Sequence, residues 1–166
     1  MGTNNEVLIT MDRNITIKKT LMINAKSLFP DIRVYGDSYI TMGKGVSFNN
    51  YCHLTATKKA EIIIGDNVLF GPFVMINTGN HGYKDSNRLI RDQECYRRSI
   101  KIGNDVWVGA HVSILAGSNI PDKCVIGAGS VVNRKDNLEK GGVYAGSPIR
   151  LIKKGCHNVS CSFYNE

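Results

Sequence analysis

The regular spacing of aliphatic side chains is the feature that most constrains how this chain folds. In the second half of the chain an aliphatic residue recurs at every sixth position, and a small or β-branched residue usually follows it four places later. Neither the roughly 3.6-residue period of an α-helix nor the strict alternation of a single strand explains this spacing. The units open at Ile102, Val108, Ile114, Ile120, Ile126 and Val132.

The same period extends upstream, with two interruptions. A short break lies between Ala56 and Ile63, and a longer excursion covers residues 82–101. We therefore expect a single domain over 1–166, with irregular N-terminal coils over 1–41, a solenoid over 42–136 and a C-terminal segment over 137–166. The upstream units open at Met42, Phe48, Leu54, Ile64, Phe70 and Ile76.

A period of six fits one flat side of a coiled β-structure, in which a short strand is followed by a corner that glycine or asparagine can turn. Three sides complete a coil, and coils stack at about 4.8 Å, the spacing of paired strands. The predicted fold class is all-β: a three-sided parallel solenoid with one large loop excursion and a short C-terminal helix or tail near Pro148–Lys154. Stacking predicts one inward column of Cys52, Val74, Val112 and Ser130, and another of Val68, Val106 and Cys124.

The five cysteines, an odd number, argue against a disulfide framework. Cys52 and Cys124 fall at inward positions, where they are expected to act as small buried hydrophobes. Cys156 and Cys161 lie near His157 in a polar tail, which supplies too few ligands for a metal site. We therefore expect no metal.

The charge balance favours an anionic partner. Lysine and arginine number 21 against 14 acidic residues, a formal net charge of +7. A polyphosphate ligand would explain this excess, and so would a protein that is simply basic. No nucleic-acid-binding motif accompanies it. Because no apolar run approaches about 20 residues and no secretory signal is visible, the expected location is cytoplasmic, without a membrane span.

Chemistry is expected where the repeat is interrupted, and His81 stands at the start of the long excursion. An imidazole titrates near neutral pH and can accept the proton of an attacking hydroxyl. The other histidines have weaker contexts: His111 lies mid-unit and is expected to point outward, His53 is expected at a corner, and His157 lies in the tail. His81 is therefore the candidate general base.

Several segments together resemble a known family. They are Asn77-Thr78-Gly79-Asn80-His81, the later run Ile102-Gly103-Asn104-Asp105-Val106-Trp107-Val108-Gly109, and the closing segment Ala145-Gly146-Ser147-Pro148-Ile149-Arg150. This pattern resembles the left-handed β-helix acyltransferases, and within them the maltose and galactoside O-acetyltransferase group. Glu94 and Tyr96 keep that group's spacing.

The resemblance implies a left-handed coil, a homotrimer, and transfer of an acetyl group from acetyl-CoA to a saccharide hydroxyl. It assigns His81 as the base and points to Asn49, with Asn50 beside it, as the amide that holds the acceptor or the oxyanion. We expect direct attack in a ternary complex, and Glu94 is the candidate acid that orients the imidazole. Trp107 either walls the acceptor pocket or packs at a subunit contact.

The resemblance also implies a donor site. The pantetheine arm is expected along exposed backbone of the late coils, and the CoA phosphates are expected against basic side chains. Two departures stand out: Ala110 occupies a position where the family often has serine, and the break from Thr55 to Glu61 has no clear counterpart of an acceptor-contacting acid. The donor residues are Ala110, Ala128, Gly129, Arg134, Lys135, Arg150 and Lys153.

Three other readings remain at this point. The same solenoid hosts zinc-dependent carbonic anhydrases, for which His81 and His111 would supply only two of three ligands. An inert solenoid could serve as a binding or scaffolding protein, which would not bind CoA. Within the transferase reading, N-acetylation of an amino sugar or nucleotide sugar is the alternative.

Overall fold

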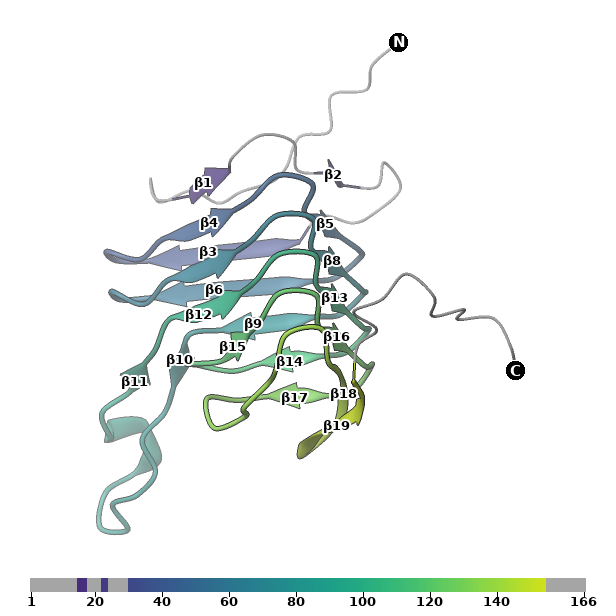
Figure 1. Cartoon of the computed structure of the whole chain (residues 1–166). Coiled ribbons are helices and arrows are strands. Elements are labelled where there is room, and N and C mark those ends of the chain that lie inside the picture. The colour runs from purple at the N-terminus through teal and green to yellow at the C-terminus, as the bar shows by residue number, and fades with distance from the viewer. Residues whose placement is uncertain (1–14, 18–21, 24–29, 155–166) are drawn as a thin grey trace, which may run out of the picture.

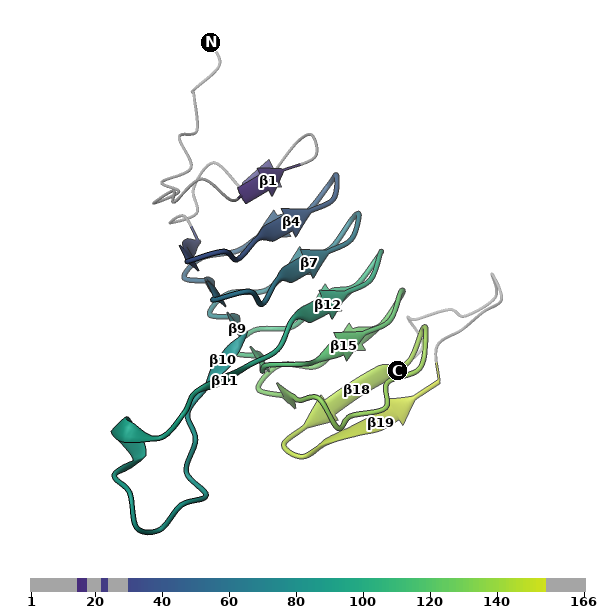
Figure 2. The same ribbon diagram turned by 90° about the vertical axis from the view of Figure 1, so that its left-hand side faces the viewer.

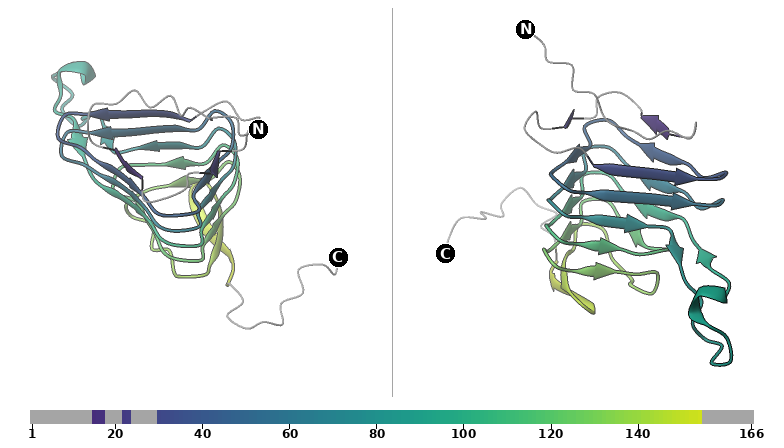
Figure 3. Two further views of the ribbon diagram at one scale, coloured as in Figure 1. Left: turned by 90° about the horizontal axis from the view of Figure 1, so that it is seen from above. Right: turned by 180° about the vertical axis from the view of Figure 1, so that it is seen from behind.

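The computed structural model describes residues 15–17, 22–23 and 30–154, which form a parallel β-helix with three sheets (Figure 1). Each coil passes through sheets A, B and C in turn and winds left-handedly, giving a triangular outline in Figure 3. Sheet A contains, in spatial order, β1 (Ile15–Ile17), β4 (Ile40–Met42), β7 (Ile62–Ile64), β12 (Ile100–Ile102) and β15 (Asn119–Ile120).

The other two sheets complete the prism. Sheet B contains β2 (Met22–Ile23), β5 (Ser47–Phe48), β8 (Leu69–Phe70), β13 (Trp107–Val108), β16 (Val125–Ile126), β18 (Val143–Gly146) and β19 (Ile149–Lys153). Sheet C contains β3 (Asp31–Tyr35), β6 (His53–Thr57), β9 (Met75–Asn77), β14 (Ser113–Ile114) and β17 (Val131–Val132).

The predicted inward columns are confirmed. Val68, Val106 and Cys124 precede strands that pair in register, and the column from Cys52 to Ser130 does the same on sheet C. Every member of both columns is buried, as is each aliphatic residue that opens a unit. The small polar members are satisfied internally: the Ser130 hydroxyl donates to the Gly127 carbonyl at 2.6 Å, and the Cys124 thiol contacts the Glu139 carbonyl at 3.2 Å.

The glycines that follow many unit-opening residues were expected to turn the corners, but the structure gives another reason for them. Gly65, Gly103 and Gly109 do not adopt positive φ. Instead, a Cβ on Gly103 would lie 2.6 Å from the backbone nitrogen of Asp122 in the next coil. The left-handed residues at the corners are mostly not glycine, and they include Asn67 and Asp105. The glycines are therefore needed for the close approach of adjacent coils, while other residues turn the corners.

Polar side chains tie one coil to the next at the corner between sheets A and B. The Asp66 carboxylate accepts the backbone N–H of Lys44 at 2.9 Å, the Asn104 amide oxygen accepts that of Asp66 at 2.8 Å, and the Asp122 carboxylate accepts that of Asn104 at 2.8 Å. The Asn104 N–H lowers the pKa of Asp122, since it stabilises the ionised carboxylate. This ladder gives backbone groups at the corner the partners that sheet pairing does not supply.

The expectation of a short helix or tail near Pro148–Lys154 was wrong. Residues Ile149–Lys153 form a strand, not a helix, and this β19 pairs antiparallel with β18. β18 itself continues sheet B next to β16, so the stacking persists beyond the last regular unit. A strand here gives the free edge of β18 its hydrogen-bond partners. The tail cysteines Cys156 and Cys161, with His157, lie outside the described residues.

The N-terminal coils and the two breaks have defined shapes. Strands β1, β2 and β3 pair with β4, β5 and β6 of the following coil, so coil pairing begins ahead of residue 42. The short break is a widened corner: β3 and β6 are both five residues long, and the turn after β6 places Lys58 and Lys59 at positive φ. The long excursion leaves sheet C after β9 and returns at β12.

The close approach of the coils yields a stability prediction. Replacing Gly103 with alanine should lower the free energy of unfolding by about 1–3 kcal/mol, because the new methyl group meets backbone that cannot move aside. Lys101→Ala, on the exposed side of β12 just before Gly103, should change the free energy of unfolding by less than about 0.5 kcal/mol. Urea denaturation of both variants at one protein concentration measures this, and equal midpoints would contradict the packing argument.

Candidate active site

The long excursion is an antiparallel arm that projects from the corner between sheets C and A (Figure 2). It consists of β10 (Gly79–Asn80), a 3-10 turn at Ile90–Asp92, and β11 (Tyr96–Arg97), and it carries His81 directly after β10. Gly79 pairs with Arg97, and Asn80 pairs with Tyr96. The arm therefore holds His81 and Cys95 opposite each other, one step beyond the paired residues.

Alternation along the returning strand gives the arm two faces with different chemistry. Successive side chains of a strand point to opposite sides. Glu94, Tyr96 and Arg98 accordingly line one cavity, whereas Cys95 and Arg97 line another. We call the first the basic cleft and the second the arm pocket.

The arm pocket contains His81 and has a volume of about 420 Å³. The imidazole Nδ1 lies 3.3 Å from the Cys95 thiol, and the Arg97 guanidinium donates to the Cys95 carbonyl at 3.1 Å. His81 is exposed, so its second nitrogen, Nε2, is open to a ligand. The lining residues are Tyr35, Thr55, Thr57, Lys58, Asn77, Gly79, Asn80, His81, Cys95 and Arg97.

Glu94 lies on the other face of the arm, where it lines the basic cleft and not the arm pocket. The side chain that contacts the His81 ring is that of Cys95, not that of Glu94. Sequence reasoning missed Cys95 because family spacing drew attention to the acid, although counting alternate residues from Arg97 would have placed the thiol on the histidine's side.

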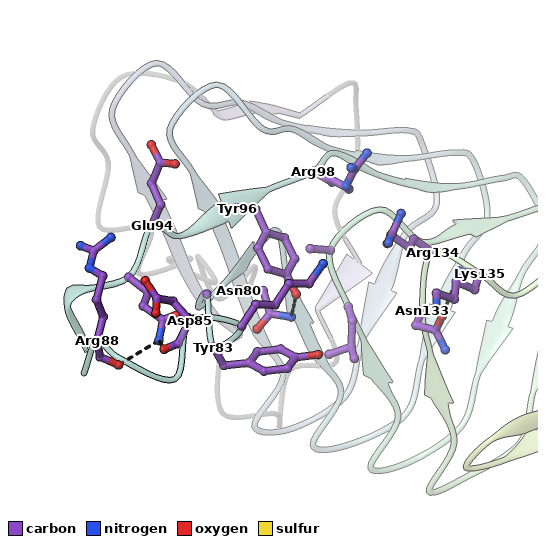
Figure 4. Close-up of a pocket in the computed structure, with 15 residues that line it drawn as sticks. Asn80, Tyr83, Asp85, Arg88, Glu94, Tyr96, Arg98, Asn133, Arg134 and Lys135 are labelled. Atoms are coloured by element: carbon purple, nitrogen blue, oxygen red, sulfur yellow. Dashed lines mark hydrogen bonds between the residues drawn. The ribbon is translucent and has the colours of Figure 1, made fainter. Parts of the chain in front are cut away.

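The basic cleft is the larger cavity, about 780 Å³, between the arm and the lower coils (Figure 4). Arg134 and Lys135, two of the predicted phosphate-binding residues, line it together with Arg98 from β11's continuation. Side-chain carbons of Arg98 and Arg134 both lie about 3 Å from where a Cβ of Gly117 would stand, so these two basic side chains are neighbours beside that turn. Arg98 was not predicted, since nothing in its sequence context indicated which way it pointed.

A chain of polar contacts runs along the outer face of sheet C into the arm pocket. The Asp31 carboxylate lies 3.1 Å from His53 Nδ1, and His53 Nε2 lies 2.7 Å from the Thr55 hydroxyl. His53 is the first residue of β6 and not a corner residue, contrary to expectation. The acid–histidine–hydroxyl order was invisible in the sequence because Asp31 belongs to the previous coil. It fixes the orientation of the Thr55 hydroxyl at the pocket.

The predicted pantetheine-contacting residues lie along a different edge, the corner between sheets B and C, which we call the B–C edge. Ala110, Ala128 and Gly129 follow β13 and β16 at this edge, and Asn49 follows β5 there. Asn49 is exposed, and its side-chain oxygen accepts the backbone N–H of Asn50 at 2.8 Å. The structure thus groups Asn49 with the predicted donor backbone, a full face of sheet C away from the arm (Figure 3).

An aromatic stack runs along the same B–C edge. The ring centroids of Tyr51 and Phe73 are 4.8 Å apart, and those of Phe73 and His111 are 4.7 Å apart. His111 is exposed, as expected, and all three residues adopt positive φ. His111 is thus stacked on a ring, and no cluster of three His, Cys, Asp or Glu side chains suited to a metal occurs among the described residues.

The remaining predicted residues are spread over sheet B. Arg150 and Lys153 lie on β19, where Arg150 pairs with Ala145 of β18 and both side chains are exposed. Trp107 is also exposed on the outer face of sheet B, in register with Leu69 and Val125. Within one chain, Trp107 lines neither the arm pocket nor the basic cleft.

The two core cysteines are not suited to chemistry. Burial raises the pKa of the Cys52 and Cys124 thiols, consistent with inert core residues.

The comparisons with known proteins agree with this architecture. The family described as "Bacterial transferase hexapeptide (six repeats)" matches residues 99–134. A crystal structure of a maltose O-acetyltransferase from Clostridium difficile 630 is 34% identical, with a TM-score of 0.61 over 78% of this chain and 69% of that one. The chain belongs to the hexapeptide-repeat acetyltransferase family.

Two further members of this hexapeptide family are similar over most of the solenoid. A galactoside O-acetyltransferase of Escherichia coli K12 is 38% identical over 110 residues, which are 66% of this chain and 52% of the relative. A galactoside acetyltransferase structure in complex with coenzyme A is 33% identical, with a TM-score of 0.62 over 81% of this chain and 64% of that one. The chain spans about half the length of the curated relatives it matches.

Among the described residues of this family member, no helix is long and apolar enough to cross a membrane. Within that part of the chain the only helical segment is the short turn in the arm.

The polar chain at the arm pocket yields a pH prediction. The Arg33 guanidinium, 2.7 Å away, lowers the pKa of Asp31, and His53 adds to the effect. Because the pKa of Asp31 is lower in the folded protein, the ionised carboxylate stabilises the fold at any pH above 3.8, the ordinary pKa of an aspartate. This stabilisation is lost as the pH falls through the pKa of the folded state. Because Asp31 is about half exposed, the contribution should stay below about 1 kcal/mol.

Asp31→Asn should therefore unfold at a lower urea concentration than the wild type at pH 7, and the two midpoints should converge as the pH falls below about 4. Asp37→Asn, a substitution at a carboxylate with no ion pair among the described residues, serves as the control. A difference between Asp31→Asn and the wild type that grows on acidification would contradict the assignment.

Proposed function

We propose that this protein transfers an acetyl group from acetyl-CoA to a hydroxyl of a saccharide, with His81 as general base. The observation that supports this most directly is the position of His81: an exposed imidazole, held at one nitrogen, in a pocket lined by hydroxyl and amide groups. The family relationship supports the acetyl donor, since a similar structure was determined with coenzyme A. A saccharide acceptor agrees with the names of the relatives.

The geometry at His81 suits removal of a proton from an alcohol. In the tautomer whose Nδ1–H points to the Cys95 sulfur, Nε2 carries the lone pair that can accept a proton. As the acceptor oxygen attacks the thioester carbonyl, its proton passes to Nε2. Collapse of the tetrahedral intermediate forms the ester, breaks the C–S bond and returns the proton to the departing CoA thiolate. We assign the stabilisation of the oxyanion to the Asn49 amide.

The donor is proposed to lie along the B–C edge. Ala110, Ala128 and Gly129 present small side chains there, so the backbone can approach a pantetheine arm closely. A Cβ on Gly129 would meet nothing within 4 Å, which describes an open position on that edge. Arg150 and Lys153 on β19, and Arg134 and Lys135 in the basic cleft, are the proposed phosphate contacts.

This arrangement implies that the working enzyme contains more than one chain. The arm, which carries His81 directly after β10, projects from the corner between sheets C and A (Figure 3), whereas the proposed donor residues and Asn49 follow strands of sheet B at the B–C edge, at the other end of sheet C. One chain therefore contributes the general base to one site and the donor edge to another. We propose a homotrimer in which the arm of each copy reaches the B–C edge of the next, so that closed threefold symmetry completes three equivalent sites.

The proposed activity is tested by release of the CoA thiol from acetyl-CoA in the presence of candidate acceptors. The panel contains free sugars, oligosaccharides, nucleotide sugars and amino sugars, and the acetylated product is identified by mass spectrometry and NMR. An O-linked acetyl group on a saccharide is the expected result. Acetylation only of amino groups would replace the proposal by N-acetyl transfer.

His81→Ala should lower kcat by about 10²–10⁴, the usual contribution of a general base. The affinity for acetyl-CoA and the oligomeric state should change little, because His81 is exposed on the arm and not part of the core. Calorimetry and light scattering provide these two controls. A variant that retained more than about a third of wild-type turnover would exclude His81 as the base.

The shared site predicts complementation between two inactive variants. His81→Ala removes the base, and Ala128→Asp places an exposed negative charge on the proposed donor edge. In randomly mixed trimers, about a quarter of the contacts between copies pair an intact arm with an intact edge, so about a quarter of wild-type activity should return. Each variant alone remains inactive. Failure of co-expressed variants to recover activity, or a stable monomer by light scattering, would contradict the shared site.

A further inference from the structure

The charge of the arm pocket goes beyond the proposed reaction, because it indicates what kind of acceptor the pocket takes. We propose that the acceptor is an anionic saccharide, one that carries a carboxylate or a phosphate, held by Lys58 and Arg97 beside His81. This inference rests on the proposed function, since it names the substrate class of the same site.

The residues that line the pocket include two basic side chains and no carboxylate. Lys58 comes from the widened corner after β6, and Arg97 comes from β11 of the arm. Among the described residues neither takes part in an ion pair, whereas five other pairs occur. Two cations left unpaired around one cavity favour an anionic ligand, which would gain charge-assisted hydrogen bonds there.

Arg97 is positioned for this role. Its guanidinium donates one hydrogen bond to the Cys95 carbonyl at 3.1 Å, which holds it over the pocket and leaves other N–H groups free of that contact. The residue paired with it across the arm is Gly79, which has no side chain to cover it. Lys58 is anchored through its backbone, whose N–H donates to the Tyr35 carbonyl at 2.9 Å, and it adopts positive φ at the turn.

The uncharged part of the lining suits a sugar. The hydroxyls of Tyr35, Thr55 and Thr57 and the amides of Asn77 and Asn80 line the pocket, and beyond the internal contacts of Thr57, Asn77 and Asn80 each group keeps hydrogen-bonding capacity for ring hydroxyls. The Thr55 hydroxyl is held by His53, so at least one of these groups has a fixed direction. The volume, about 420 Å³, falls within the range of about 300–1,000 Å³ usual for small-molecule sites.

The donor is the other source of negative charge, and its phosphates are a poor match for this pocket. They are joined to the reacting thioester through the whole pantetheine arm, whereas Lys58 and Arg97 line the same cavity as His81, where the chemistry takes place. The basic cleft on the opposite face of the arm, with Arg98, Arg134 and Lys135, offers those phosphates a separate set of cations. The cations beside the base are thus assigned to the acceptor.

The experiment compares matched acceptors by kcat/KM in the thiol-release assay. The first comparison pairs galacturonic acid with its methyl ester, and the second pairs glucose 6-phosphate with glucose. A kcat/KM that is about tenfold or more higher for the anionic acceptor than for its uncharged partner supports the proposal, and the comparison in which this preference appears identifies carboxylate or phosphate as the anion. The preference should shrink as salt is raised.

Variants then locate the anion site. Lys58→Gln and Arg97→Gln should each reduce the anionic-to-neutral ratio severalfold, whereas Lys59→Gln, at the neighbouring position that does not line the pocket, should leave it unchanged. Equal or faster turnover of the neutral partners would overturn the anionic acceptor and leave the proposed function standing. If no saccharide of either kind is acetylated while CoA still binds, the proposed function itself fails. An anionic preference that survives both variants would place the anion elsewhere and overturn this site.

Discussion

The fixed interval between neighbouring coils governs the rest of this structure. Paired strands stand about 4.8 Å apart, and each side chain on one coil meets the equivalent side chain on the next. The buried rings of Phe48 and Phe70 are 4.6 Å apart and nearly parallel, and the exposed rings of Tyr51, Phe73 and His111 repeat at 4.7–4.8 Å. The same interval excludes a methyl group at Gly103. Because this stack has little room to adapt, side chains that serve chemistry must lie at corners or on segments that leave the coil.

The six-residue period was sufficient to predict the core, because inward positions in a stack of equal layers all face the same restriction on size. It identified Val68, Val106 and Cys124 as one inward column, and all three are buried. The period says nothing about a segment whose structure depends on a distant partner. Ile149–Lys153 became a strand because β18 had a free edge, and local sequence alone does not reveal that edge. The purpose of the glycines was likewise misjudged, since the obstacle at Gly103 is the backbone of the next coil.

For the candidate site, as for the fold, the sequence indicated positions set by the repeat but not contacts that depend on a distant partner. His81 was predicted as the general base from its place at the end of a regular unit, and this role stays a prediction; the structure places it directly after β10, where the arm begins. Its immediate partner was not identifiable, because Glu94 and Cys95 are neighbours in sequence and lie on opposite faces of the arm. Lys58 and Arg97, which we propose to bind the acceptor, were not predicted for a related reason: one belongs to the short break and the other to the long one, and only the folded coil brings both breaks to the same corner.

The two halves of the proposed site are therefore built by different means. The B–C edge is assembled from the repeat, so Ala110 and Ala128 occupy equivalent places on successive coils and inherit the rigidity of the stack. The arm pocket is assembled from the two interruptions, and its charged residues Lys58 and Arg97 are exposed and free of the core's packing restrictions. Under this proposal, substitutions at exposed positions of the breaks, such as Lys58 and Arg97, would alter which acceptor is bound without disturbing the donor edge, whereas Ile62 and Ile100 belong to the core. A donor site fixed by the repeat and an acceptor site set by its interruptions is the arrangement that would allow one solenoid to serve different acceptors.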